Sequence, residues 1–241
     1  MALRVSLFVT CIVDQFFPRV GMAMAETLER LGCAVDFPEA QTCCGQPAFN
    51  SGYRDEARGV AAHFLDTFDG CDYVVAPSGS CTSMVTHHYE ELFAGDARRL
   101  EQLHRLAPRV FEYSQFLTSV LEVDALGARF PHKVTYHDGC HALRELKIKQ
   151  QPRQLLSLVE GLQLVEMEPA EECCGFGGTF SVKFASVSSA MAETKIDAIL
   201  RTGAEYVVSA DSSCLMQIEG RMRRDGHAVR AIHLAEVLAS R

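Results

Sequence analysis

Cys43-Cys44-Gly45 and Cys173-Cys174-Gly175 are the two segments that decide how this 241-residue sequence is interpreted. The same uncommon triplet occurs twice, and each copy has one lone cysteine upstream and one downstream at similar distances. The lone cysteines are Cys11 and Cys81 around the first triplet, and Cys140 and Cys214 around the second. The repetition indicates that a whole domain has been duplicated and that each copy carries one four-cysteine site.

The sequence between the cysteines is repeated as well. Tyr73-Val74-Val75 precedes the last cysteine of the first copy, and Tyr206-Val207-Val208 precedes the last cysteine of the second. We therefore predict two fused halves, at residues 1–125 and 130–241, that share an interface.

Composition excludes several classes of protein. Hydrophobic residues make up 48% of the chain and charged residues 22%, as in ordinary globular proteins. A formal net charge of −8 argues against a nucleic-acid-binding surface, which would need clustered Lys and Arg. The apolar run from Val5 to Val13 is too short to span a membrane and lacks the marks of a signal peptide. We predict a cytoplasmic protein without direct membrane insertion.

The cysteine content points to metal or redox chemistry. Ten cysteines in a chain without a signal peptide are expected to stay reduced, because the cytoplasm disfavours structural disulfides. Eight of the ten belong to the two repeated quartets. The other two, Cys33 and Cys71, have no counterpart in the other half, and we expect both to be buried free thiols.

The order of the predicted elements indicates an α/β fold. Predicted strands are 4–10, 34–37, 73–76 and 110–113 in the first half, and 133–136, 163–167, 206–209 and 229–232 in the second. Predicted helices are 19–31, 55–68, 84–93 and 114–121, then 152–160, 186–202 and 233–238. We predict two doubly wound parallel-sheet halves related by pseudo-symmetry. Such sheets bind ligands beyond the C-terminal ends of their strands, where the cysteines are therefore expected to meet.

Four thiolates from separate loops suit a tetrahedral zinc ion or an iron–sulfur cluster, because soft sulfur ligands select these metals. The spacing favours a cluster, since structural zinc usually takes close Cys-x-x-Cys pairs. Here two ligands are adjacent, and adjacent side chains tend to diverge towards different irons of a larger core. Zinc and catalytic dithiol chemistry are the alternatives for either quartet.

Glycines support the cluster interpretation. They follow both triplets, as Gly45 in the first half and as Gly175, Gly177 and Gly178 in the second. A residue without a side chain lets backbone N–H groups approach an anionic core. The alternative is that residues 175–178 form only a flexible turn.

Two histidines, His137 and His141, flank Cys140. A histidine in this position can bind metal, donate a hydrogen bond to sulfur or shuttle a proton. The alternative is a polar loop residue that packs near the site.

The quartets resemble those of the Cys-Cys-Gly domain family of iron–sulfur proteins, and the resemblance covers nearly the whole chain. The family pattern is a lone cysteine, a long gap, Cys-Cys-Gly, a second long gap and Cys-x-x-Cys, usually twice. Members include the heterodisulfide reductase B subunit and the glycolate oxidase iron–sulfur subunit. The segments most similar to the lactate utilisation group of this family are Pro77-Ser78-Gly79-Ser80-Cys81 and Asp211-Ser212-Ser213-Cys214-Leu215-Met216.

This resemblance implies an iron–sulfur electron-transfer subunit of a multi-protein system that oxidises L-lactate to pyruvate. It implies sister subunits, one with ferredoxin-type clusters, so the chain would be an oxidoreductase subunit rather than a complete enzyme. It also implies one or two [4Fe-4S] clusters, with zinc possible in one half. The implied metal ligands are Cys11, Cys43, Cys44 and Cys81, and Cys140, Cys173, Cys174 and Cys214.

The sequence departs from the family at the last cysteine of each half, which is replaced by Met84 and by Gln217. A cluster with five thiolates therefore cannot form from the motif alone. Two other functions stay open: a heterodisulfide or thiol–disulfide reductase-type catalytic subunit, and a zinc-stabilised assembly protein without enzymatic activity. No catalytic residue is assigned.

Overall fold

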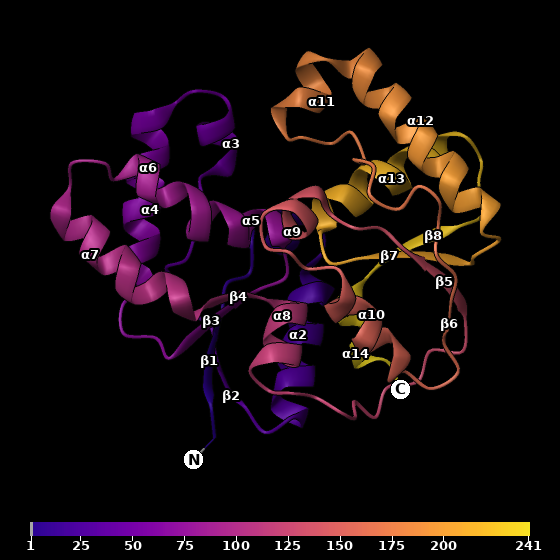
Figure 1. Cartoon of the computed structure of the whole chain (residues 1–241), viewed down its shortest axis with the longest axis horizontal. Coiled ribbons are helices and arrows are strands. Elements are labelled where there is room, and N and C mark those ends of the chain that lie inside the picture. The colour runs from indigo at the N-terminus through magenta and orange to yellow at the C-terminus, as the bar shows by residue number, and fades with distance from the viewer. Residues whose placement is uncertain (1) are drawn as a thin grey trace.

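The computed structural model describes residues 2–241, so the first residue of the predicted first half lies outside the described residues. Each half is built on a four-stranded parallel sheet, and the strand orders are β2-β1-β3-β4 and β6-β5-β7-β8 (Figure 1). The strands are β1 Arg4–Leu7, β2 Ala34–Asp36, β3 Tyr73–Ala76, β4 Val110–Glu112, β5 Lys133–Tyr136, β6 Gln163–Leu164, β7 Tyr206–Ser209 and β8 Arg230–His233. The two orders agree strand by strand, which confirms the predicted α/β fold with two similar halves.

Helices flank both sheets. In the first half they are α1 Cys11–Phe16, α2 Pro18–Arg30, α3 Gln46–Asn50, α4 Arg54–Thr67, α5 Gly79–Ser83, the π-helix η1 Met84–His88, α6 Tyr89–Leu92, α7 Ala97–Leu106, the 3-10 helix η2 Ala107–Arg109 and α8 Tyr113–Ser119. In the second half they are α9 Cys140–Arg144, α10 Gln150–Ser157, α11 Thr179–Lys183, α12 Ala185–Arg201, α13 Ser212–Arg224 and α14 Leu234–Ala239. Because both faces are covered, the central strands β3 and β7 are almost continuously buried.

Some predicted boundaries were wrong. The strand predicted at 4–10 ends at Leu7, because helix α1 begins at Cys11. The strand predicted at 163–167 contains only Gln163 and Leu164. The helix predicted at 84–93 is divided into a π-helical turn and α6.

The two halves share one hydrophobic core. Leu28 and Phe116 from the first half belong to the same buried cluster as Leu234 and Leu238 from the second. Helix α2 packs against α14, and Arg30 Nη2 donates a hydrogen bond to the Leu238 carbonyl at 2.6 Å. The packing fixes the halves against one another, while the division near residue 125 stays a prediction.

Among the described residues, no helix is both long and apolar enough to cross a membrane. Cys33 is a buried free thiol, as predicted. Cys71 is also free but only half-buried, so the prediction of burial was wrong there. Its sulfur accepts a hydrogen bond from Ser6 Oγ at 3.1 Å, so the thiol has a polar partner in its half-buried position.

Candidate metal centre

One cavity of about 120 Å³ lies between the halves and is lined by all eight cysteines of the quartets. Each half contributes its strand ends and the loops that follow them. The sequence predicted that the cysteines of each quartet would meet, and they do. It did not predict that the two quartets would face the same cavity.

In the first half, three loops deliver the four sulfurs. Cys11 begins α1 after β1, and Cys81 lies in α5 after β3. Cys43 and Cys44 lie in the loop between β2 and α3. The Sγ atoms of Cys11 and Cys43 are 3.7 Å apart, and those of Cys44 and Cys81 are 3.3 Å apart. The quartet therefore consists of two close sulfur pairs, one half-buried and one buried.

The second half repeats this arrangement. Cys140 begins α9 after β5, Cys214 lies in the first turns of α13 after β7, and the adjacent pair lies in the loop between β6 and α11. The ligand atoms of Cys174 and Cys214 lie within 4.8 Å of one another, and the neighbouring Cys173 raises the pKa of Cys140. Cys174 and Cys214 are the buried members.

Gly45 and Gly175 give both triplets the same conformation. Their φ angles are 85° and 84°, a left-handed region that glycine adopts without the penalty of a Cβ atom. In each half the glycine N–H donates a hydrogen bond to the first cysteine of the triplet, at 3.4 Å to Cys43 and 3.4 Å to Cys173. The predicted role of these glycines, to let backbone N–H groups approach an anionic core, stays a prediction.

Gly177 and Gly178 lie in the cavity wall, with φ angles of 52° and 62°. Their neighbour Thr179 begins α11, and its hydroxyl lies 3.3 Å from Ser51 Oγ of the first half. The glycine segment therefore belongs to the contact between the halves as well as to the site.

One thiol in each quartet favours the thiolate form. A hydrogen bond from Cys11, followed by one from Cys44, lowers the pKa of Cys43 to about 3. Hydrogen bonds from Cys140 and Cys174 lower the pKa of Cys173 to about 2. Thiolates are the form of cysteine that binds metals and attacks disulfides.

Asp211 and Ser78 tie the two halves together beside the cysteines. The Asp211 carboxylate caps the N-terminus of α13 by accepting a hydrogen bond from Ser213 N at 3.2 Å. Its other oxygen accepts hydrogen bonds from Ser78 Oγ and Ser80 N of the first half, both at 3.2 Å. Ser78 in turn caps α5, which carries Cys81. The position of each quartet thus depends on the other half.

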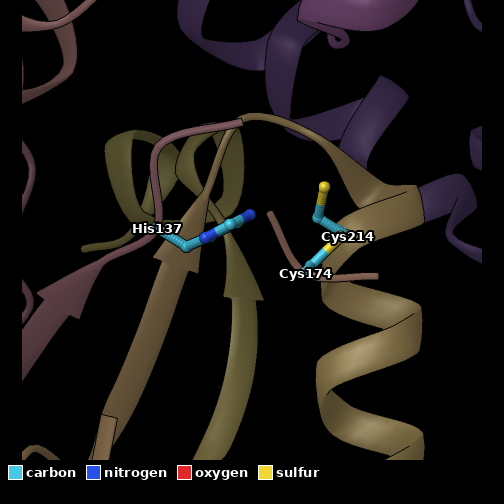
Figure 2. A group of neighbouring side chains, drawn as sticks. All are labelled: His137, Cys174 and Cys214. Carbon is cyan, nitrogen blue, oxygen red and sulfur yellow. The ribbon is translucent and has the colours of Figure 1, made fainter. Parts of the chain in front are cut away.

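Within residues 2–241, the second quartet has a histidine beside it and the first quartet does not. The ligand atoms of His137, Cys174 and Cys214 lie within 4.8 Å of one another (Figure 2). His137 is fully buried, and neither ring nitrogen has a hydrogen-bond partner. Burial lowers its pKa to about 3. The other flanking histidine, His141, is half-buried and places Nδ1 3.5 Å from Cys140 Sγ.

The residues at the fifth-cysteine positions have structural contacts. Met84 is fully buried in the core of the first half. Gln217 Nε2 donates to Ser188 Oγ at 2.9 Å, and Ser188 Oγ donates to the Gly175 carbonyl at 2.8 Å. Gln217 therefore supports the second glycine turn from behind.

The donor set suits a metal or a metal cluster. The eight thiols and one nitrogen of the unpartnered His137 ring are groups that can bind a soft metal, while the two glycine N–H groups donate hydrogen bonds to sulfurs of this set.

Comparison with known proteins agrees with the duplicated site. The family model described as a cysteine-rich domain matches twice, at residues 5–86 and 134–219. Fold and site thus define a protein with two cysteine-rich domains, each containing one quartet.

Relatives that match this chain over almost their whole length identify the family more closely. Lactate utilization protein A of Geobacillus sp. (strain WCH70) is 48% identical over 239 residues, which cover 99% of this chain and 100% of that protein. Lactate utilization protein A of Exiguobacterium sp. (strain ATCC BAA-1283 / AT1b) is 50% identical over 237 residues, with coverage of 98% and 96%. The chain belongs to the lactate utilization protein A family of cysteine-rich-domain proteins.

Among solved structures, a hypothetical protein from Helicobacter pylori has a similar fold. The TM-score is 0.69 at 8% identity, and the match covers 98% of this chain and 48% of that one. At such low identity the similarity shows the shared fold alone.

Proposed function

We propose that this protein is an iron–sulfur electron-transfer subunit of a multi-protein system that oxidises L-lactate to pyruvate. The observation that carries the proposal is the convergence of two four-cysteine groups on one cavity. Full-length similarity to proteins named for lactate utilization supports the metabolic role. Sister subunits, one with ferredoxin-type clusters, would exchange electrons with this chain in the cytoplasm, where thiols stay reduced.

In this proposal each quartet holds one cluster, expected to be of the [4Fe-4S] type, through its four thiolates. A bound cluster accepts and donates single electrons. The chain supplies the ligands, and Gly45 and Gly175 donate N–H hydrogen bonds to sulfur. Such hydrogen bonds and the degree of solvent exposure set the reduction potential of a cluster. The buried sulfurs of Cys44 and Cys174 lie on the side of each site away from water.

Metal analysis of protein purified without oxygen tests the proposal. Wild-type protein should contain iron and acid-labile sulfide and give an electron paramagnetic resonance signal after partial reduction. Cys44→Ala and Cys174→Ala should each lose the iron that is bound at the mutated site and keep the iron of the other site. Cys71→Ala, which alters a half-buried thiol outside both quartets, serves as the matched control and should keep all of it. Wild-type protein without iron would contradict the proposal.

The same analysis decides the alternative for the second half. His137, Cys174 and Cys214 approach closely enough for a single zinc ion, which accepts mixed nitrogen and sulfur ligands. Zinc at one equivalent, lost in Cys174→Ala but kept in Cys44→Ala, would replace the second cluster in the proposal. Zinc in both halves, without a redox response, would favour an assembly protein.

A second candidate function is reduction of a small disulfide, favoured by the pair Cys11 and Cys43. The Cys43 thiolate would attack one sulfur of the disulfide and release the other as a thiolate. Cys11, with its Sγ 3.7 Å away, would then give its proton to the released thiolate and attack the mixed disulfide, so that the bound half leaves as a second thiolate and a Cys11–Cys43 disulfide remains for a partner to reduce. Reduced, metal-free protein should then consume one equivalent of a small disulfide per quartet. Cys43→Ser should abolish the disulfide consumption of the first quartet.

A further inference from the structure

Phe8 and His137 occupy equivalent positions in the two halves. Each follows the last residue of its strand, β1 or β5. The backbone N–H of Phe8 donates to the Val75 carbonyl at 2.9 Å, and that of His137 donates to the Val208 carbonyl at 2.8 Å. Val75 and Val208 are themselves equivalent members of the repeated strands. The duplication has therefore placed an apolar ring in one half where the other has an imidazole.

Packing alone explains the ring in the first half. Phe8 is fully buried and makes edge-to-face contacts with Phe64 and Phe68, with ring centroids 4.9 and 5.6 Å apart. These are favourable aromatic geometries. A hydrocarbon side chain is thus sufficient to complete the core behind the first quartet.

Packing does not explain the ring in the second half. His137 is as deeply buried as Phe8, yet both of its nitrogens lack a hydrogen-bond partner within the described residues. Buried polar groups without partners are rare and require an explanation such as a bound ion. The neighbouring amine of Lys195 does not supply the partner, because it donates to the Pro169 and Ala170 carbonyls at 3.2 and 3.0 Å.

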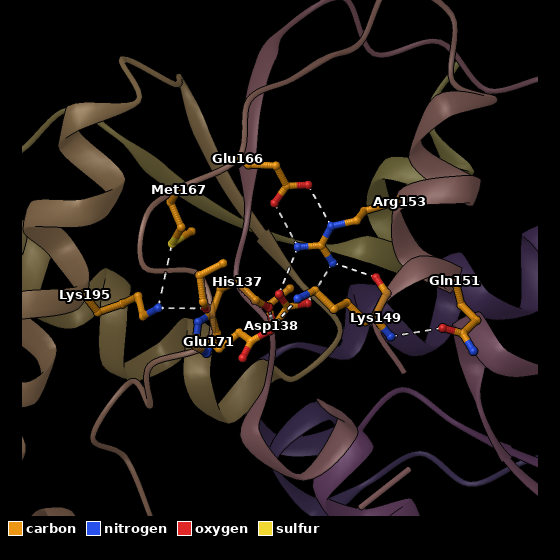
Figure 3. Close-up of polar contacts among 11 residues, drawn as sticks. His137, Asp138, Lys149, Gln151, Arg153, Glu166, Met167, Glu171 and Lys195 are labelled. Atoms are coloured by element: carbon orange, nitrogen blue, oxygen red, sulfur yellow. Dashed lines mark hydrogen bonds and ion pairs between the residues drawn. The ribbon is translucent and has the colours of Figure 1, made fainter. Parts of the chain in front are cut away.

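The imidazole points towards the metal ligands. Figure 2 shows the His137 ring extending from the end of β5 towards Cys174 and Cys214. The three ligand atoms lie within 4.8 Å of one another, the spacing at which one metal atom can contact all three. The strand end is also held firmly: the next residue, Asp138, accepts two hydrogen bonds from Arg153 at 2.8 and 2.9 Å (Figure 3).

We propose that His137 is a nitrogen ligand of the metal centre in the second half, so that the two centres of the chain are chemically different. The inference rests on the proposed metal-binding role of the quartets. A neutral imidazole donates one nitrogen lone pair to zinc or iron, and no other group in the protein is then needed to satisfy that atom. The first half, with Phe8 in the same place, has sulfur ligands only.

A consequence for electron transfer follows from the ligand type. Replacing thiolates by neutral imidazoles raises the reduction potential of an iron–sulfur centre, because less negative charge surrounds the iron. Where His137 takes the place of one of the four thiolates in the second half, the second centre is expected to have the higher potential of the two. Electrons that enter the chain would settle on the second half.

Isotope labelling tests the ligand directly. Protein produced with ¹⁴N-histidine or ¹⁵N-histidine and purified without oxygen is examined by pulsed electron paramagnetic resonance after partial reduction. A strong nitrogen coupling that changes with the isotope identifies a histidine bound to iron. If the second half holds zinc, zinc-edge X-ray absorption should instead show nitrogen at about 2.0 Å beside sulfur at about 2.3 Å.

Two variants identify which histidine binds. His137→Phe reproduces the residue of the first half and should abolish the nitrogen signal, while His141→Gln should keep it. In a redox titration, His137→Phe should lower the potential of one centre and leave the other unchanged. His137→Gln, which keeps a polar side chain of similar reach, provides a second measurement if the Phe variant does not fold.

The outcomes separate the two proposals. Wild-type protein without bound metal would overturn the proposed function and this inference together. Metal in both halves with no histidine coupling, or with a coupling that survives His137→Phe, would overturn only the ligand role of His137. A coupling that is lost in His141→Gln and kept in His137→Phe would identify His141 as the ligand. This result would also overturn the ligand role of His137.

Discussion

The two halves of the molecule agree in their sulfur positions and differ in what lies behind them. Both place a close pair of thiols at the cavity and a glycine N–H at 3.4 Å from the first cysteine of the triplet. Behind the first quartet the strand β1 is followed by Phe8 and Val9, which pack among apolar residues. Behind the second quartet the strand β5 is followed by His137 and Asp138, which are buried and polar.

The difference shows that duplication has preserved the positions of the cysteines more strictly than their surroundings. Backbone hydrogen bonds and glycine conformations place the sulfurs, and these are the same in both halves. The side chains at Phe8 and His137 differ between the halves although these backbone features are shared. The surroundings of a metal centre control its potential and solvent access, so two copies of one scaffold can serve different steps.

The largest expected effect concerns the buried ion pair of the second half. Asp138→Asn leaves Arg153 without its buried carboxylate partner, whose side chain is 1% exposed. Removing one member of such a pair costs about 3–5 kcal/mol of unfolding free energy. Urea unfolding of the metal-free protein, followed by circular dichroism, measures the loss.

Glu166→Gln is the control for that measurement. Glu166 binds the same guanidinium group but is 47% exposed, so its loss should cost less than about 1 kcal/mol. Equal losses in the two variants would mean that burial does not strengthen the Asp138 contact. The polar strand end of the second half would then be no more rigid than the apolar one.

The strands and long helices were predictable because buried β-branched runs and 3.6-residue periodicity leave clear patterns. Strands 73–76, 133–136 and 206–209 were predicted to the residue. Short helices such as α5 and α9 were not predicted, since fewer than two turns give no periodicity. Helix α13 was missed although Leu215, Ile218 and Met222 have helical spacing and Asp211 is a good N-cap.

The cysteines of the candidate site were predictable from the sequence, but the shared cavity was not. Repeated triplets identified both quartets, because the spacing of cysteines is visible in the sequence. The shared cavity depends on how α2 packs against α14, and the sequence gives no direct signal of that contact. The sequence also did not indicate that the His137 ring points towards Cys174 and Cys214. Aligning the two halves places His137 opposite Phe8, however, and would have shown that the two residues differ.

A smaller effect compares the glycines of the two triplets. An alanine at either position is strained by its positive φ. At Gly175 the new Cβ would also lie 2.6 Å from the Ser188 carbonyl oxygen, whereas at Gly45 the nearest atom is 3.4 Å away. Gly175→Ala should therefore cost about 1–3 kcal/mol more unfolding free energy than Gly45→Ala, as is typical of overpacking. Equal losses by urea unfolding would show that the second triplet can move away from α12.

The smallest effect is expected at two equivalent helix caps, Glu112 of α8 and His233 of α14. Burial raises the pKa of Glu112 to about 7, and burial lowers the pKa of His233 to about 4, although nearby Asp211 opposes the latter shift. The Glu112 contribution to stability is present below its unfolded pKa and lost as pH rises towards 7. The His233 contribution is present above its unfolded pKa of about 6.5 and lost as pH falls towards 4.

The two caps thus oppose each other between about pH 4.5 and 6.5, and wild-type stability should change little in that window. His233→Asn keeps a capping side chain but cannot titrate, so its unfolding free energy should fall with rising pH, by at most about 1.4 kcal/mol per pH unit. Glu112→Gln should show the reverse slope in the same urea titrations. If the unfolding free energies of the two variants change with pH in the same direction, the halves do not differ at these caps. The polar character of the second half would then be confined to the residues around its cysteines.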